Sequence, residues 1–262
     1  MNVTLGQYYP ANTLIHNLDP RVKIIGTLIY IISLFAFKGA SGLIIQSIFL
    51  ILVLLLSRLP IRLILRQIRG IYILCAVTAL FNIFFTPGEA LVASGNVTII
   101  SDQGVINAVL MTIRLIYLVI GTSIMTLSTT PSKLTDGLEK VFAPLQLFKV
   151  PVSDIAMTMT IALRFIPILT QEAGRIKRAQ TARGADFENG SLIKRAKTML
   201  SILVPLFVSA FRRADELATA MEARAYHGGA HRGKLHPLHY ERIDIISYVV
   251  LGVYFACGII LR

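Results

Sequence analysis

Charged residues, cysteines and catalytic motifs are all scarce in this sequence, and each shortage narrows the class of protein. Only 15% of the 262 residues are charged, whereas 55% are hydrophobic and the mean hydropathy is +0.68. This composition excludes an ordinary soluble domain and indicates a polytopic membrane protein. The two cysteines, Cys75 and Cys257, lie inside apolar runs, so no disulfide framework is expected.

Sequence motifs of catalysis and metal binding are missing as well. The chain has no G-x-x-x-x-G-K-[ST] loop, no G-x-S-x-G turn and no H-E-x-x-H pair, so we expect that it is not itself an enzyme. Four histidines share a short loop, but no cysteine or carboxylate lies among them: His227, His231, His236 and His239. Because glycine and proline leave this loop without a fixed ligand geometry, we expect no metal site there.

Acidic residues are few, with 14 Asp and Glu against 26 Lys and Arg, and the formal net charge is +12. In so apolar a chain, excess basic residues indicate cytoplasmic loops and acidic partners rather than nucleic acid. The block 131–242 is basic in particular, with 17 Lys and Arg against 10 Asp and Glu. A partner with an acidic or amphipathic surface would suit it.

The apolar runs predict an all-α, polytopic membrane protein with about five transmembrane helices. These are expected over 22–37, 43–56, 71–86, 105–128 and 243–261, with an interfacial helix of four arginines over 58–69. The loop 87–104 contains no Lys or Arg, so it is expected outside the cell. The N-terminus and the block 131–242 are then cytoplasmic, and the C-terminus is outside.

Arg114 is the one charge inside the fourth predicted span. A charge there is costly unless it faces protein, so packing against other helices is the simpler interpretation. A role in a transport path is the alternative.

The predicted domains are a membrane part over 1–130, a cytoplasmic block of amphipathic helices over 131–242 and a last transmembrane helix over 243–262. Two helices in this block end in similar tripeptides, Ala182-Arg183-Gly184 and Ala223-Arg224-Ala225, with the arginines 41 positions apart. Glycine is expected to stop each helix, Gly184 in the first and Gly228-Gly229 in the second. Each arginine then lies near a helix C-terminus, either as a solvated cap or as a side chain that reaches a partner.

A longer series of motifs runs through most of the chain in one order. It comprises Gly6-Gln7-Tyr8, Pro10, His16-Asn17-Leu18-Asp19-Pro20-Arg21, Arg164-Phe165-Ile166-Pro167, Glu172, Ala179-Gln180 and the two tripeptides. In these residues the sequence resembles the transmembrane coupling component of energy-coupling factor transporters, the membrane scaffold of cobalt and vitamin importers. One residue departs from the pattern, because Ala225 replaces a glycine and puts a glycine-dependent backbone geometry there in question.

The resemblance implies a scaffold of an ABC-type importer that takes up vitamins or other micronutrients. Two cassette ATPase subunits, which bind the ATP and Mg²⁺, would dock on Ala182, Arg183, Gly184 and on Ala223, Arg224, Ala225. A separate substrate-binding membrane subunit would contact apolar faces that include Met157, Ile161, Leu203 and Phe207. The chain itself would bind no cofactor, no metal and no nucleic acid, and would work in the lipid bilayer of the cell membrane.

Three other functions remain open from the residues alone. A conventional ABC permease would carry the substrate path in its own spans, but polar residues are sparse in them. A membrane enzyme would need clustered titratable groups, for which the histidine loop is the only candidate. A receptor-like anchor would not need paired tripeptides.

Overall fold

The computed structural model describes residues 8–37, 39–87, 90–94, 97–187, 189, 191–226, 228 and 238–260. The chain divides into two compact units: Gly6–Val141 with Leu238–Arg262, and Phe142–Pro237 with Met1–Leu5. The motif residues Gly6 and Gln7 and the histidines His227, His231 and His236 lie outside the described residues, so the prediction of a loop without metal is not addressed there.

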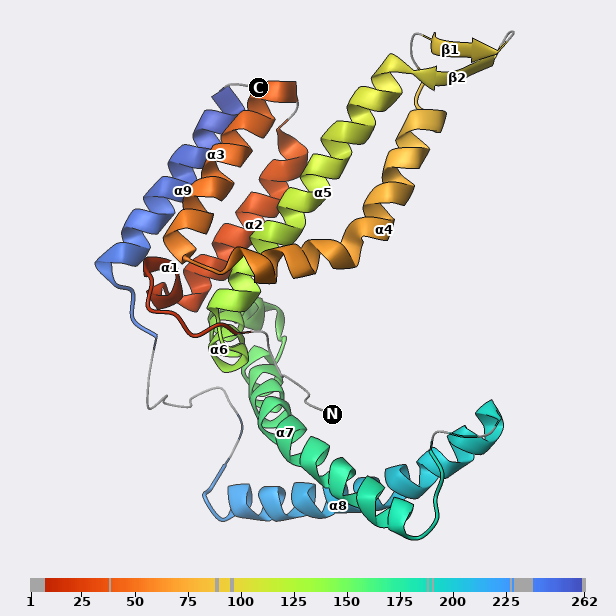
Figure 1. Ribbon diagram of the computed structural model, residues 1–262. Coiled ribbons are helices and arrows are strands. Elements are labelled where there is room, and N and C mark those ends of the chain that lie inside the picture. The colour runs from red at the N-terminus through yellow and green to blue at the C-terminus, as the bar shows by residue number, and fades with distance from the viewer. Residues whose placement is uncertain are drawn as a thin grey trace. The chain divides into compact units, whose positions relative to one another are not determined.

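The larger unit is built from helices (Figure 1). They are α1 (Leu14–Asn17), α2 (Pro20–Ala36), α3 (Gly39–Ser57), α4 (Ile61–Phe85), α5 (Asp102–Ser128), α6 (Pro131–Val141) and α9 (Arg242–Ile260). A short antiparallel hairpin of β1 (Ala90–Ser94) and β2 (Val97–Ser101) connects α4 to α5. The helices α2, α3, α5 and α9 pack against one another, and α4 packs along α5. The prediction of an all-α polytopic membrane protein is confirmed, with the hairpin as an addition in the predicted loop 87–104.

Local sequence sets where these helices begin. The Asp19 carboxylate accepts a hydrogen bond from the Arg21 N–H and Pro20 occupies the first helical position, so α2 has both a cap and a fixed first φ angle. Ser101 caps α5 by accepting from the Gly104 N–H. These short polar side chains satisfy backbone donors that a helix start would otherwise leave without partners.

Among the described residues, four helices are long and apolar enough to cross a membrane: Ile61–Phe85, Asp102–Ser128, Val152–Ala182 and Arg242–Ile260. Within α3, the segment Ser41–Ser57 counts as a shorter apolar helix, and α2 has only 17 residues. This set differs from the five predicted spans in two ways: the predicted spans 22–37 and 43–56 are not in it, because their helices are too short, and the long helix Val152–Ala182 is in it. Sequence alone placed that helix in the coupling block, since charged residues follow its apolar half.

Two further boundaries differ from the prediction. The interfacial segment over 58–69 and the span over 71–86 form one continuous helix, α4, which bends sharply along its course (Figure 1). Helix α6 packs on α2 within the larger unit, where a Cβ atom on Gly137 would lie 2.8 Å from the Pro20 Cβ. Because this contact is so close, α6 packs as part of the larger unit. The prediction had grouped its residues with the block 131–242.

The core of the larger unit is aromatic and aliphatic with a few buried hydroxyls. Tyr30, Leu34, Phe37 and Tyr254 belong to its buried cluster. The Tyr254 and Ser33 hydroxyls lie 2.5 Å apart, so a buried polar pair connects α9 to α2. A hydrogen-bonded pair of this kind avoids the cost of burying a hydroxyl without a partner.

Arg114 contacts the end of a neighbouring helix. Its Nη2 donates to the Phe37 carbonyl at 3.1 Å, at the C-terminal end of α2. A cation is favoured there because the last carbonyls of a helix lack intrahelical partners. The Phe37 carbonyl is therefore a specific partner for Arg114, in agreement with the interpretation that this arginine packs against another helix.

Asp244 joins the first turns of α2 and α9. It is 2% exposed; its Oδ1 accepts from the Asp19 N–H and its Oδ2 from the Glu241 N–H, both at 2.8 Å. Since Asp19 is the N-cap of α2 and Glu241 precedes α9, one carboxylate satisfies a backbone donor at both helix starts. The bond to Asp19 spans 225 positions of sequence and so helps to fix the fold.

His16 is buried beside this junction. Its Nε2 faces the Tyr9 carbonyl at 3.1 Å, so this nitrogen donates, and its Nδ1 lies 2.6 Å from the Thr13 hydroxyl. Burial lowers the pKa of His16 below its ordinary value, against the opposing effect of the Tyr9 hydrogen bond. The motif His16 to Arg21 is therefore structural, since His16 contacts Thr13 and Tyr9 before it in the chain and Asp19 connects the start of α2 to Asp244 of α9.

The smaller unit contains a 3₁₀ turn, η1 (Ala143–Phe148), and two long helices, α7 (Val152–Ala182) and α8 (Leu192–Glu222). In sequence, η1 follows α6 and precedes α7. Ser191 caps α8 by accepting from the Lys194 N–H, and Pro167 and Pro205 lie inside the two helices. The helices α7 and α8 cross and contact each other (Figure 1).

Candidate functional site

The first tripeptide lies at the C-terminal end of α7. The Gly184 N–H donates to the Thr181 carbonyl at 2.9 Å and the Ala185 N–H to the Gln180 carbonyl at 3.0 Å. Gly184 has a φ of +88°, the left-handed conformation that favours glycine. This pair of bonds is a Schellman ending, which satisfies the free carbonyls of the last turn.

The second tripeptide closes α8 in the same way. The Ala225 N–H donates to the Glu222 carbonyl at 2.9 Å and the Tyr226 N–H to the Met221 carbonyl at 3.1 Å. The two ends therefore share one backbone pattern, with Arg183 and Arg224 at equivalent positions. We call these two ends, 182–184 and 223–225, the arginine tips.

The prediction that Gly228-Gly229 stops the second helix is wrong, because α8 ends at Glu222 and its turn closes at Ala225. Ala225 has a φ of 54°, so a residue with a Cβ atom adopts the left-handed conformation that Gly184 adopts in the first tip. The substitution of glycine by alanine preserves the turn at a conformational cost of about 1–2 kcal/mol. Sequence reasoning relied on glycine as the stop signal and so placed the end too late.

Both arginine side chains are exposed. The ion pairs found in the described part of the chain, Arg21 with Asp19 and Arg213 with Glu172, involve neither of them. Each guanidinium has five N–H donors in a planar fork that matches a carboxylate or a row of carbonyls. The arrangement thus presents two cations at the ends of two rigid helices.

An ion pair connects the two helices where they cross. Arg213 Nη2 of α8 lies 2.8 Å from Glu172 Oε2 of α7, and the Ser209 hydroxyl donates to Glu172 Oε1 at 3.1 Å. Both carboxylate oxygens of Glu172 are therefore bonded to α8. We call these three residues the crossing clamp. It fixes how the two helices meet, because an ion pair with a second hydrogen bond to the same carboxylate is more directional than apolar packing.

A ridge of small residues on α8 lies beside the crossing. Ala210, Ala214 and Ala218 line a cavity of about 450 Å³ together with Phe165 and Leu169 of α7. Small side chains at four-residue spacing leave room there between the helices.

A strip of apolar side chains on α8 is exposed. Leu203 is 49% exposed and Phe207 is 61% exposed, and the Phe207 and Phe211 rings lie 5.4 Å apart. On α7, Met157 and Ile161 are half-buried, whereas Ile155 and Met159 are exposed. An exposed apolar strip of this length on a helix is typical of a surface that another protein or lipid covers.

Comparison with known proteins agrees with this geometry. A family model described as CbiQ, cobalt transport protein, matches residues 11–235. A protein of Clostridium kluyveri, named energy-coupling factor transporter transmembrane protein EcfT, is 45% identical over 262 residues, covering all of this chain and 97% of that protein. Proteins of the same name from Acidaminococcus fermentans and Ruminiclostridium cellulolyticum are 44% and 42% identical over 261 residues, again covering all of this chain and 97% of theirs.

The chain belongs to this family of energy-coupling factor transporter transmembrane proteins. Its membership confirms the resemblance drawn from the tripeptides and the N-terminal motif, and it makes the chain a membrane component of a transporter. Within this family the conventional permease is the less favoured alternative.

Some residues of the site were missed by sequence reasoning. Arg213 and Ser209 complete the clamp with Glu172, but nothing in their local pattern marks residues 37 and 41 positions away as partners. Val204, Val208 and Phe211 extend the exposed strip on α8, and their spacing of three and four residues could have identified them.

The strained turn at Ala225 gives a first prediction. Replacing it with glycine, Ala225→Gly, is expected to slow hydrogen exchange in the last turn of α8 by about two- to fivefold, because glycine adopts the left-handed conformation without a Cβ clash. The matched change Gly184→Ala is expected to speed exchange at the end of α7, since a Cβ atom there meets open space and only the φ angle opposes it. Mass spectrometry of both peptides measures this, and exchange that is equal in all variants would contradict the shared Schellman ending.

The crossing clamp gives a second prediction. Arg213→Glu or Glu172→Arg alone is expected to speed hydrogen exchange at the crossing of α7 and α8 by about fivefold, because like charges then face each other. The exchanged pair, with both substitutions in one chain, should restore most of the protection. Arg212→Glu, an exposed neighbour on α8, is the matched control. If the two single-substitution variants exchange like this control, the ion pair does not hold the crossing.

Proposed function

We propose that this chain is the coupling scaffold of an energy-coupling factor importer. It couples ATP hydrolysis by two cassette ATPase subunits to the reorientation of a substrate-binding membrane subunit that takes up a vitamin or another micronutrient. The observation that carries the proposal is the pair of equivalent arginine tips, each an exposed cation on the same backbone turn. Two equivalent docking elements suit a partner that is itself a pair of similar subunits.

In this proposal Arg183 and Arg224 each enter a groove on one ATPase. A guanidinium that is desolvated against carbonyl or carboxylate acceptors gains about 1.5–3 kcal/mol per hydrogen bond. The flanking residues Ala182, Gly184, Ala223 and Ala225 are small, so the helix ends present little bulk beside the arginines. The ATPases, and not this chain, bind the ATP and Mg²⁺.

The two helices act as levers that transmit the movement of the ATPases. The crossing clamp connects them, so a displacement of one tip changes the position of the other helix at Arg213 and Glu172. Their apolar faces, with Met157, Ile161, Leu203 and Phe207, contact the substrate-binding subunit. The exposure of Leu203 and Phe207 supports this role more directly than the half-buried positions of Met157 and Ile161.

The proposed orientation has the N-terminus and the arginine tips in the cytoplasm, where ATP is available, and the C-terminus outside. The four arginines over 58–69 and the loop over 87–104 without Lys or Arg support it through the positive-inside rule.

Co-expression with candidate cassette ATPases tests the proposal. The wild-type chain, purified in detergent by a tag on its C-terminus, is expected to retain both ATPase subunits. Arg183→Ala or Arg224→Ala should each reduce the retained ATPase about tenfold or more, as the loss of one charged hydrogen bond predicts. Equal retention by wild type and both variants would reject docking at the arginine tips.

A further inference from the structure

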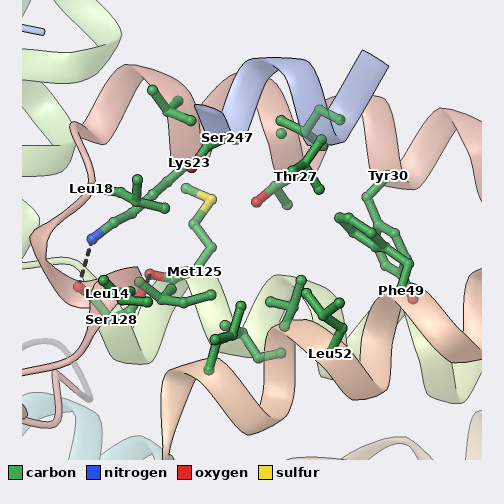
Figure 2. A pocket seen from close by; sticks show the side chains of 18 of the residues that line it. Leu14, Leu18, Lys23, Thr27, Tyr30, Phe49, Leu52, Met125, Ser128 and Ser247 are labelled. Atoms are coloured by element: carbon green, nitrogen blue, oxygen red, sulfur yellow. Dashed lines mark hydrogen bonds between the residues drawn. The ribbon is translucent and has the colours of Figure 1, made fainter. Parts of the chain in front are cut away.

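The larger unit contains a cavity of about 280 Å³ that the coupling function does not use. Five helices contribute to its wall: α1, α2, α3, α5 and α9. Figure 2 shows side chains from these helices around an open interior, with Met125, Thr27 and Leu52 among them. A space of this size in a packed bundle is destabilising when it is empty, because side chains that face a void lose their dispersion contacts.

The wall is apolar along most of its length. Leucine, isoleucine, valine and aromatic side chains predominate, and Tyr30 and Phe49 lie at one end (Figure 2). The polar exceptions among its side chains are Lys23, Thr27, Ser128 and Ser247, besides the Tyr30 hydroxyl. A cavity lined in this way does not favour water, which needs two to four polar partners.

Lys23 makes the end of the cavity opposite Tyr30 polar (Figure 2). It is 8% exposed, and its Nζ donates to the His16 and Ser128 carbonyls, both at 3.0 Å. An ammonium group has three donors, so one remains after these two bonds. In the described part of the chain no carboxylate lies within ion-pair distance of Lys23, although the Asp19 and Asp244 carboxylates attract its charge from further away. The remaining N–H donor can still bond an anionic group at that end.

The exposed lining residues on α3 and α9 indicate where the cavity opens. Leu52 of α3 is 44% exposed, and Ile246 and Val250 of α9 are 61% and 43% exposed, so these apolar lining residues border the opening. Because α9 has the length and composition of a span, the medium outside this opening is lipid. An acyl chain can therefore enter without crossing water.

We propose that the cavity binds a membrane phospholipid, with one acyl chain inside it and the phosphate at the Lys23 end. The apolar wall accommodates the chain, and the ammonium group of Lys23 complements the negative charge of the phosphate. The bound lipid then acts as a structural part of the bundle, since it fills space among five helices.

The absence of tryptophan from the sequence makes a clean test possible. Leu52→Trp places one fluorescent reporter at the opening, and Leu74→Trp places a matched reporter on α4, where Leu74 is 53% exposed and outside the cavity wall. Each variant, delipidated in detergent, is titrated with phosphatidylglycerol that carries bromine on its acyl chains. We expect saturable quenching of the Leu52→Trp reporter at one lipid per protein, and only a shallow, unsaturated decrease for Leu74→Trp.

Filling the cavity provides the second arm of the test. Thr27→Phe, added to Leu52→Trp, is expected to remove the saturable quenching while the protein elutes as a single folded species; Ser247→Phe replaces it if Thr27→Phe does not fold. A brominated long-chain alcohol, which lacks the phosphate, should bind about tenfold more weakly than the phospholipid. Quenching of both reporters along one unsaturated curve would overturn the site, and equal binding of the alcohol would overturn the phosphate at Lys23.

Discussion

Reversing the charge of both arginine tips, with Arg183→Glu and Arg224→Glu in one chain, is expected to abolish substrate uptake by the assembled transporter. Each reversal removes charge-assisted hydrogen bonds of about 1.5–3 kcal/mol and puts a carboxylate against acceptor groups. Two lost contacts together correspond to roughly a hundredfold to ten-thousandfold weaker docking of the ATPases. Uptake into proteoliposomes, and the ATPase that remains with the purified complex, measure this loss.

The control for this variant keeps the same change in net charge. Arg178→Glu and Arg212→Glu alter two exposed arginines on α7 and α8 that lie outside the two tripeptides. If charge alone mattered, this control would fail as completely as the tip variant. We expect it to retain most of the uptake, and a control as inactive as the tip variant would count against specific docking at Arg183 and Arg224.

Removing the Asp244 carboxylate is expected to produce the largest loss of stability. Asp244→Ala leaves the Asp19 and Glu241 N–H groups buried without their acceptor, and each unsatisfied group costs about 1–3 kcal/mol. The variant should therefore lose about 2–6 kcal/mol, which corresponds to a decrease of roughly 10 °C in the apparent melting temperature. Thermal unfolding followed by size-exclusion chromatography measures it.

A graded variant separates this mechanism from a general effect of losing a charge. Asp244→Asn keeps one carbonyl oxygen as an acceptor and replaces the other with an NH₂ group, so its loss should lie between those of wild type and alanine. Asp102→Ala changes a partly exposed carboxylate in the first turn of α5, which accepts from the Gln103 N–H, and should have a small effect. Equal melting temperatures for Asp244→Ala and Asp102→Ala would mean that the buried bridge does not stabilise the fold.

The structure shows what the residues of the N-terminal motif, His16 to Arg21, contact. His16 and Asp19 belong to the same motif, and both are buried beside the first turns of α1 and α2. Arg21 donates to the Leu238 carbonyl and lies 4.8 Å from the centre of the Tyr240 ring. The motif therefore connects the start of the chain to the segment before α9, more than 200 positions later.

The sequence by itself determined the membrane class, most of the helical segments and the two tripeptides, because these depend on properties of neighbouring residues. Hydropathy over about 20 residues, caps such as Asp19 and Ser101, and an arginine near a helix end are all local. The tertiary structure alone decided the partners of Asp244, Arg114 and Glu172, since each lies on another element at a distance that no periodicity encodes. It also decided where α8 ends, because hydrogen bonds across the turn hold Ala225 in a conformation that alanine rarely adopts on its own.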